Sequence, residues 1–595
     1  MFVRKYIAQF NATLKSINLI WKITPKGLIS IFTISFFVGI SQPIMLYVYG
    51  LFINQLNLSL VTLEISYLVA IFILYYILQA FSNITSLLLN YVSEIQAQYI
   101  QKEITDSILS KSNRLMMKMF DDSEVYNNIN MISNETYRVQ NIIGNLITIF
   151  SSLISLFGII GIVFFQYKLI TLLSVVVFIP ALLIGVNINK RMYKLYVSRL
   201  ENMRLASALQ ALMLRYDNIK EIKIYKAGTY LRKIISDIYS GHITEDKKVK
   251  RKNTIQLSLA NILENIIGAI LKLYLLIDGI RGADLLGNLV MRISAIDYIM
   301  NNVRNIIKTL AAIMEDNIYI TTTFNFLENK YDEESADGFV LSSFDKIVFQ
   351  NVSFKYPKKA NYVFEDINIT FEKSKSYLII GANGVGKTTL IKLLAGLYEP
   401  TNGKILIDNI PISDYSIASY HNLIGIVFQD YIKYPLTVEE NIKIGNHSDF
   451  YNNEKMHEAA RKVGVEQFVQ KLQNKYHTIL SNEWIDGTNL SQGQWQKLAI
   501  SRAYFAQPLL MIMDEPTASL DAYAENKLYN NIAELMKEST TIMISHRYTT
   551  AKLVDEIIVL GEKGVIEKGT FEELMNKKGK FSEMFKLQAE KYGMH

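Results

Sequence analysis

The chain has 595 residues, of which 50% are hydrophobic and only 20% are charged, and its mean hydropathy is +0.16. A positive mean over this length indicates long apolar segments, which excludes an ordinary soluble enzyme and favours a membrane protein. Because the sequence has no cysteine, structural disulfides, thiolate metal sites and a cysteine-protease centre are excluded. The net charge of +7 forms no basic tail, so nothing points to nucleic acid as a partner.

Six segments in the first half are long and apolar enough to cross a lipid bilayer, which needs about 20 apolar residues. They are residues 28–53, 66–92, 142–166, 168–188, 256–278 and 284–312. Basic residues concentrate before the first span and in the segments 93–141 and 189–255, whereas the loops on the other side hold few. This distribution predicts a multi-pass protein of the cytoplasmic membrane with both termini in the cytoplasm. The first 27 residues resemble an interfacial amphipathic helix and not a cleaved signal peptide.

The two long cytoplasmic segments show helical periodicity, which predicts that spans two to five continue as helices past the membrane. At 1.5 Å per residue each hairpin would project about 35–40 Å. We expect the hairpins to turn at residues 121–127 and 216–221, where the sequence is short and polar. A plain solvated hairpin explains the same pattern equally well.

A polar, acidic segment around Glu328–Ser335 separates the apolar half from a region of different character. Short apolar strands alternate with helical stretches after it, a pattern typical of an α/β domain. The clearest expected strands are Lys346–Phe349, Ser376–Ile380 and Leu509–Met513. We therefore predict a multidomain chain: an all-α six-helix transmembrane domain over 1–325, a linker over 326–345 and an α/β P-loop nucleotide-binding domain over 346–595.

The segment Gly381–Thr388 reads G-x-x-x-x-G-K-T and stands between an apolar strand and a helical run. Glycines let backbone N–H groups surround phosphates, Lys387 can reach the β- and γ-phosphates, and the Thr388 hydroxyl can ligate Mg²⁺. The sequence therefore predicts an ATP site. Its expected residues here are Gly381, Ala382, Asn383, Gly384, Val385, Gly386, Lys387, Thr388 and Thr389.

The strand Leu509–Met513 ends in two carboxylates, Asp514 and Glu515. A buried strand would place Asp514 at the Mg²⁺ and Glu515 one residue further, where it can polarise the attacking water. An apolar strand that ends in Asp-Glu is weak on its own. The phosphate-loop motif earlier in the chain makes the hydrolytic interpretation strong.

Between these motifs, Leu490–Gln494 reads L-S-Q-G-Q, and with this segment the sequence resembles the ATP-binding cassette (ABC) transporters. The resemblance implies that Ser491, Gly493 and Gln494 stand at a helix N-terminus and contact the γ-phosphate held by the opposite subunit. Gln492 departs from the glycine usual in this motif, but it leaves the serine and Gly493 available.

Four further positions match the family. The resemblance implies that Tyr356 stacks on adenine and that Gln429 contacts Mg²⁺ and the membrane domain. It also implies that Asp521 lies in the loop joining the two active sites and that His546 senses the γ-phosphate. Ordinary packing is the alternative for a lone tyrosine or histidine, but the order and spacing around two strong motifs favour the family roles. One membrane half and one cassette in the chain imply a homodimer with two equivalent ATP sites.

Six spans ahead of one cassette resemble the exporter branch of the family over essentially the whole chain, and the hairpin tips would then be its coupling helices. The local sequences of residues 428–434, 440–442 and 493–497 most resemble those of exporters of lanthionine-containing antimicrobial peptides. Residues 483–487 replace the glutamate-rich stretch of most drug and lipid exporters. We expect a peptide cargo, whose leader a separate protease would remove, with a multidrug or lipid exporter as the alternative.

Polar residues recur at helical spacing in the last two expected spans. They are Asn261, Glu264, Asn265 and Lys272 in the fifth, and Asp297, Asn301, Arg304, Asn305 and Lys308 in the sixth. Charges that face lipid are costly, so such stripes face a water-filled cavity or another helix. We hypothesise a polar cavity suited to a peptide; pairing between helices is the alternative.

Two other classes fit the cassette but not the whole chain. A soluble cassette ATPase acting on ribosomes or DNA would lack the six spans and would have a second cassette. A regulatory ATP sensor would not need Glu515 and His546 together.

Overall fold

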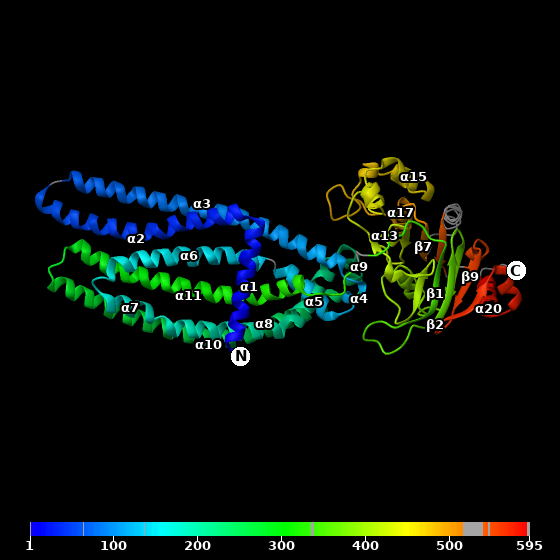
Figure 1. Cartoon of the computed structure of the whole chain (residues 1–595), viewed down its shortest axis with the longest axis horizontal. Helices are drawn as coiled ribbons and strands as arrows, with labels where there is room; N and C mark the ends of the chain where they lie inside the picture. The colour runs from blue at the N-terminus through cyan, green and yellow to red at the C-terminus, as the bar shows by residue number, and fades with distance from the viewer. Residues whose placement is uncertain are drawn as a thin grey trace. The chain divides into compact units, whose positions relative to one another are not determined.

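The structure, a computed structural model, describes residues 2–63, 65–135, 137–334, 338–515, 539–545 and 548–591. The chain forms two compact units (Figure 1). One unit comprises residues 1–113 and 124–329 and is helical wherever it has regular structure. The other comprises residues 114–123 and 330–595 and contains both β-sheets.

The helical unit contains ten helices among its described residues. They are α1 (Phe2–Ile23), α2 (Pro25–Thr62), α3 (Ser66–Arg114), α5 (Ser123–Glu135), α6 (Tyr137–Val163), α7 (Lys168–Val176), α8 (Ile179–Leu214), α9 (Tyr216–Ile224), α10 (Ala227–Arg281) and α11 (Leu286–Glu328). In the described part of the chain, five helical segments are long and apolar enough to cross a membrane. The sixth expected span lies on α11, where charged residues interrupt the apolar sequence.

The expected span 168–188 lies within a candidate membrane segment, Lys168–Leu214, which is divided into two consecutive helices. α7 ends at Val176 and α8 begins at Ile179, with a turn between them. Pro180 stands in the first turn of α8, where its missing N–H leaves no bond unmade. The proline would clash with a preceding helical turn, so it ends α7 and begins α8.

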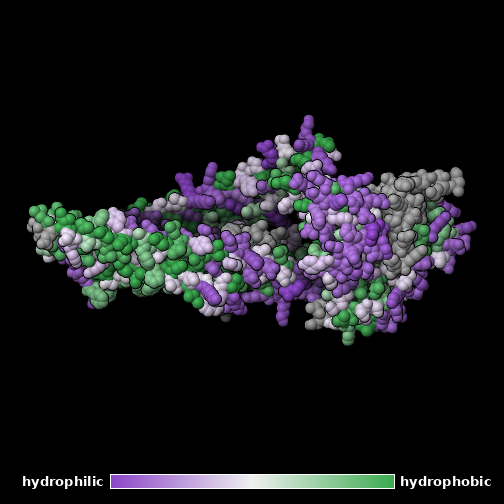
Figure 2. All heavy atoms as spheres, turned by 90° about the horizontal axis from the view of Figure 1, so that it is seen from above, coloured by the Kyte–Doolittle hydropathy of each residue, from purple (hydrophilic) through white to green (hydrophobic). Residues whose placement is uncertain are grey.

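The helices extend well beyond a bilayer. The 49 residues of α3 measure about 75 Å at 1.5 Å per residue, against about 30 Å of hydrocarbon. Hydrophobic side chains cover this unit at the end that carries the α2–α3 and α10–α11 turns, and hydrophilic side chains increase away from it (Figure 2). The length predicted from helical periodicity is therefore present.

A short helix lies at or next to each of the two expected hairpin turns. The chain turns at Asp121 and Asp122, after the short helix α4 (Met117–Phe120) and before α5. The second expected turn, residues 216–221, lies within α9.

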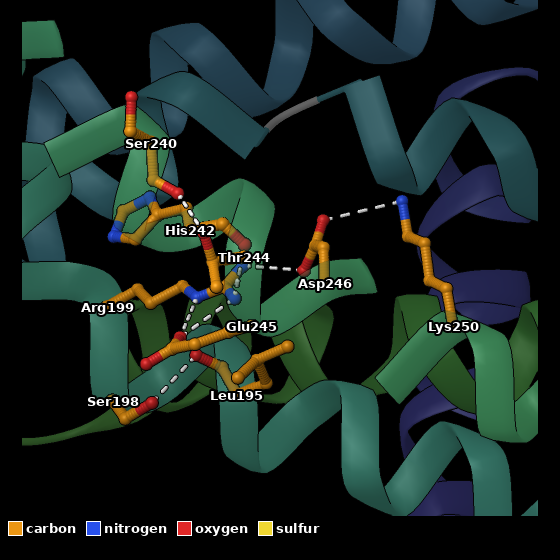
Figure 3. Close-up of polar contacts among 9 residues, drawn as sticks. All are labelled: Leu195, Ser198, Arg199, Ser240, His242, Thr244, Glu245, Asp246 and Lys250. Atoms are coloured by element: carbon orange, nitrogen blue, oxygen red, sulfur yellow. Dashed lines mark hydrogen bonds and ion pairs between the residues drawn. The ribbon is translucent and has the colours of Figure 1, made fainter. Parts of the chain in front are cut away.

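Arg199 on α8 joins the two arms of the second hairpin (Figure 3). Its Nε and Nη2 donate to Glu245 of α10 at 3.0 and 2.9 Å, and its Nη1 donates to Asp246 at 2.8 Å. Nη2 also donates to the carbonyl oxygen of His242 at 3.0 Å. The arginine side chain is only 12% exposed, so this fork of charge-assisted bonds braces α8 against α10.

We expect Arg199→Ala to lower the thermal unfolding midpoint of the detergent-solubilised protein. The loss should correspond to about 1–2 kcal/mol, because the partner carboxylates are partly exposed and can be rehydrated. Lys250→Ala is the matched control, since Lys250 is 63% exposed and reaches only Asp246, at 3.4 Å. Equal midpoints for both variants would contradict the bracing role.

The second unit contains ten strands among its described residues. They are β1 (Lys346–Phe354), β2 (Phe364–Glu372), β3 (Ser376–Gly381), β4 (Asn402–Ile407), β5 (Ile410–Pro411), β6 (Ile424–Val427), β7 (Leu510–Asp514), β8 (Thr540–Ile544), β9 (Glu556–Leu560) and β10 (Val565–Gly569). Its α-helices are α4, α12 (Lys387–Leu394), α13 (Ile417–His421), α14 (Val438–Lys443), α15 (Asn453–Val463), α16 (Glu466–Val469), α17 (Gln492–Phe505), α19 (Phe571–Lys577) and α20 (Lys580–Lys591). All three strands expected from the sequence are present.

The larger sheet has the order β10-β9-β3-β8-β7-β6, and all its neighbours pair in parallel except the edge pair β10-β9. The smaller sheet, β2-β1-β4-β5, is antiparallel. Every residue of β3, β7 and β8 is buried, which explains their continuous apolar sequences. Because parallel strands end at one edge, the loop after β3 and the end of β7 lie at the same edge of the sheet.

Candidate functional site

Two glycines of the loop after β3 have backbone conformations that favour glycine, and one of them is also closely packed. Gly384 and Gly386 have φ angles of +80° and +105°, which residues with a side chain rarely adopt. A Cβ on Gly386 would also lie 2.6 Å from Val363 and 2.7 Å from Phe364. The loop then enters α12, whose N-terminus directs N–H groups toward the loop and favours a bound anion.

Lys387 is the first residue of α12 and is only 8% exposed. Its ammonium donates to the carbonyl oxygens of Gly381 at 2.9 Å and Ala382 at 3.0 Å. Burial lowers the pKa of Lys387, because an anionic partner is not close enough to offset the loss of water. A phosphate in the loop would supply that missing negative charge, so the residue fits a bound nucleotide.

Thr388 and Asp514 meet across the sheet edge. The Thr388 hydroxyl donates to Asp514 Oδ2 at 3.0 Å, and Asp514 is only 3% exposed. Burial raises the pKa of Asp514. A hydroxyl and a carboxylate are oxygen ligands of the kind that Mg²⁺ prefers.

Glu515 follows Asp514 with a φ of +51°, a strained conformation for a residue with a side chain. Its N–H donates to the carbonyl of Ile544 at 3.0 Å, and its own carbonyl accepts from Gln496 Nε2 at 3.2 Å. These bonds hold the turn. Gln429 Nε2 donates to Glu515 Oε2 at 3.0 Å, so the structure brings together Thr388, Gln429, Asp514 and Glu515.

Tyr356 lies in the loop between β1 and β2, and its hydroxyl shares a hydrogen bond of 3.0 Å with Thr389 of α12. Its ring makes edge contacts with Phe354 and Tyr398, at centroid distances of 5.1 and 5.4 Å. The expected adenine residue is therefore tied to the helix that begins at the phosphate loop.

Ser491 is the N-cap of α17. Its hydroxyl oxygen accepts from the Gln494 N–H at 3.3 Å, and Gln494 Oε1 accepts from the Ser491 N–H at 2.9 Å. This reciprocal capping box fixes both side chains at a helix N-terminus. The S-x-x-Q spacing was a signal for it in the sequence. Gly493 lies in the first turn between them.

Asp521 and His546, the two remaining expected site residues, lie outside the described residues. Asn383 and Val385 belong to the described phosphate loop.

The polar stripes of the fifth and sixth expected spans are joined by ion pairs. Lys272 of α10 donates to Asp297 of α11 at 2.9 Å, and Arg304 of α11 donates to Glu264 of α10 at 3.3 Å. Glu264 is only 2% exposed, so its charge belongs to the helix interface. The remaining members, Asn261, Asn265, Asn301, Asn305 and Lys308, are exposed. Pairing between helices, the alternative considered from the sequence, thus accounts for the charges of four residues.

Three hydrogen bonds between distant segments have no signal in the sequence. Asn302 of α11 donates to Ser155 of α6 at 3.1 Å, and Ser155 donates to Gln42 of α2 at 2.6 Å. In the second unit, Tyr398 donates to Asp121 of the first hairpin turn at 2.7 Å. Each joins residues more than 100 positions apart.

The chain matches two family models: the ABC transporter transmembrane region over residues 28–303 and the ABC transporter model over residues 364–518. It is 31% identical to a subtilin transport ATP-binding protein of Bacillus subtilis, over 94% of this chain and 91% of that protein. It is 27% identical to a nisin transport ATP-binding protein of Lactococcus lactis subsp. lactis, over 90% of each.

Among solved structures, a bacterial Atm1-family ABC exporter with ATP bound has the same fold. Its TM-score is 0.80 at 20% identity, and the match covers 96% of this chain and 99% of that one. The helical unit and the two-sheet unit are thus the two parts of a type I exporter. The chain therefore belongs to the ABC transporters: it is a multi-pass membrane protein of the exporter type, with a nucleotide-binding ATPase domain coupled to transport.

Proposed function

We propose that this chain exports a lanthionine-containing antimicrobial peptide across the cytoplasmic membrane, driven by ATP. The observation that carries the proposal is the similarity to the subtilin transport protein, which spans both the membrane half and the cassette. Six spans over 1–325, a linker over 326–345 and a cassette over 346–595, with both termini in the cytoplasm, complete the proposed organisation. The sequence contains no cysteine, so a separate protease would remove any leader.

We propose that ATP and Mg²⁺ bind at the candidate site. The backbone of Gly381–Gly386 and the Lys387 ammonium would surround the phosphates, while Tyr356 would stack on the base. Thr388, Gln429 and Asp514 would ligate Mg²⁺, which when bound neutralises charge on the phosphates. Thr389 would stand beside them, with its hydroxyl on Tyr356.

In the proposed mechanism Glu515 accepts a proton from the water that attacks the γ-phosphate. The backbone bonds that hold its strained turn aim the carboxylate, and Gln429 fixes one of its oxygens. His546 would contact the γ-phosphate, and Asp521 would connect the two sites of a dimer.

The segment Leu490–Gln494 supports the proposal of a homodimer. Ser491, Gly493 and Gln494 stand at a helix N-terminus, where a hydroxyl and N–H groups favour an anion. We propose that they bind the γ-phosphate held by a second copy. Closure of the two cassettes would then move the hairpin tips and switch the membrane half between inward and outward states.

Glu515→Gln should reduce ATP hydrolysis by at least about 100-fold, because an amide cannot accept the proton of the attacking water. ATP binding should persist, since the phosphate loop is unchanged. Phosphate release and nucleotide retention by the purified protein measure the two effects.

Glu562→Gln, an exposed glutamate of the same unit, is the control and should hydrolyse ATP normally. Normal hydrolysis in Glu515→Gln would contradict the assignment of the water-activating residue.

Asp297→Ala should reduce peptide-stimulated ATP hydrolysis in lipid vesicles by about fivefold, the effect of one lost charge contact of about 1 kcal/mol. Asp297 suits this test because its side chain is 54% exposed, so the loss of its pair with Lys272 should lower stability by no more than about 1 kcal/mol. Glu264→Ala is less informative, since it leaves Arg304 without its buried partner at a cost of about 3–5 kcal/mol.

Asp237→Ala, which changes an exposed aspartate of the neighbouring helix α10, is the control and should keep full stimulation. An unchanged response in Asp297→Ala would remove this residue from the cargo site. Stimulation by lipids or hydrophobic drugs, and not by a lanthionine peptide, would contradict the proposed cargo.

A further inference from the structure

The first hairpin turn belongs to the same compact unit as the cassette. Leu115 and Glu333 form an antiparallel bridge, in which Met116 N–H donates to the Asp332 carbonyl at 3.0 Å. Glu334 N–H donates to the Arg114 carbonyl at 2.8 Å. Residues 114–123, here called the tip segment, are therefore held by backbone bonds to the chain that leads into β1.

Asp121 of the tip segment binds a buried tyrosine of the cassette. The Tyr398 hydroxyl donates to Asp121 Oδ2 at 2.7 Å, and Tyr398 is only 6% exposed. Burial, followed by this bond, raises the pKa of Tyr398, so the hydroxyl keeps its proton and remains a donor. The bond anchors the far end of the Tyr398 side chain and so holds the ring in place against its neighbours.

The ring of Tyr398 in turn supports Tyr356. The two rings meet edge to face, with centroids 5.4 Å apart and an interplanar angle of 84°, and Phe354 contacts both. Lys392 of α12 lies over both tyrosine rings, at 5.8 and 5.9 Å. Each of these contacts is weak, but together they restrict the orientation of the Tyr356 ring.

A second aspartate of the tip segment reaches the loop that carries Tyr356. Asp122 pairs with Lys358 at 3.0 Å. Lys358 has a φ of +61°, and the next residue, Lys359, donates its N–H to the Tyr356 carbonyl at 3.1 Å. The pair is exposed and weak by itself. It nevertheless connects the same loop to the same segment by a route that does not pass through Tyr398.

We propose that Tyr398 is a positioning residue for Tyr356 and that Asp121, through it, makes the tip segment part of the adenine-binding pocket. The inference rests on the proposed role of Tyr356 in binding the base. If the Tyr398–Asp121 hydrogen bond favours the orientation of the Tyr356 ring that binds ATP, then bound ATP must favour formation of the Tyr398–Asp121 bond by the same free energy. Binding of the adenine base and binding of the tip segment to Tyr398 are then thermodynamically coupled.

The test measures the dissociation constants of ATP and of inorganic triphosphate for the full-length protein in detergent, with EDTA present to prevent hydrolysis. Tyr398→Phe keeps the ring and removes the hydroxyl. It should weaken ATP binding by about three- to tenfold, the scale of one lost hydrogen bond, and leave triphosphate binding unchanged.

Asp121→Ala should give the same loss, and the double variant should bind ATP no more weakly than either single variant, because both remove one interaction. Asp121→Asn retains an acceptor oxygen and should restore most of the affinity. Asp121 is exposed, so this arm does not depend on the folding of a buried position. Tyr415→Phe removes another buried hydroxyl of the cassette, which donates to the Ile407 carbonyl at 3.3 Å, and should change neither constant.

Tyr356→Ala separates this inference from the proposed function. If Tyr356→Ala leaves ATP affinity unchanged, the adenine-binding role of Tyr356 is wrong. If it weakens ATP binding while Tyr398→Phe and Asp121→Ala do not, only the positioning role is wrong. Additive losses in the double variant, or equal weakening of ATP and triphosphate by Tyr398→Phe, would also overturn it.

Discussion

The parallel pairing of β3, β8 and β7 is the constraint on which the chemistry of this protein depends. It brings the phosphate loop after β3 and the carboxylates after β7 to one sheet edge, although more than 120 residues separate them in the chain. The Thr388–Asp514 bond exists only because of that registration. Burial of these strands on both faces also removes water from the base of the site, so charges placed there interact strongly.

The membrane half follows a different constraint, because hydrocarbon offers no hydrogen bonds to the backbone. Long helical segments satisfy it, with a short turn between α7 and α8, and the same segments continue as the arms of the hairpins. Where polar residues occur along α10 and α11, they pair across the interface in two places. The helices thus carry both the apolar surface that a bilayer needs and two ionic contacts between α10 and α11.

The features that could be predicted from the sequence are those that depend on a few consecutive residues. The G-x-x-x-x-G-K-T loop, the strand ending in Asp514 and Glu515, and the S-x-x-Q cap of α17 each combine a local pattern with a local structure. Pro180 is also a local signal for the turn between α7 and α8. The continuous apolar sequence around it, however, predicts a single span.

Contacts between distant segments could not be predicted in the same way. Asp121 and Tyr398 are 277 positions apart, and neither residue lies in a motif. The spacing of the polar residues on α10 and α11 predicts which of them share a helix face. Whether these residues line a cavity or form ion pairs depends on how the two helices are rotated relative to each other. Arg199 is similar: its carboxylate partners appear in the sequence only as members of a charged helix.

The cap on α17 has a consequence for how two cassettes would meet. The Ser491 oxygen is already held by the Gln494 N–H, so the side chain does not have to be ordered when a second nucleotide arrives. Its hydroxyl proton remains free to rotate toward a phosphate oxygen, because accepting a bond does not use the O–H group. Binding of a phosphate at this position in the proposed dimer would therefore need only the reorientation of one proton. The conformational entropy of the side chain would already have been lost when the single chain folded.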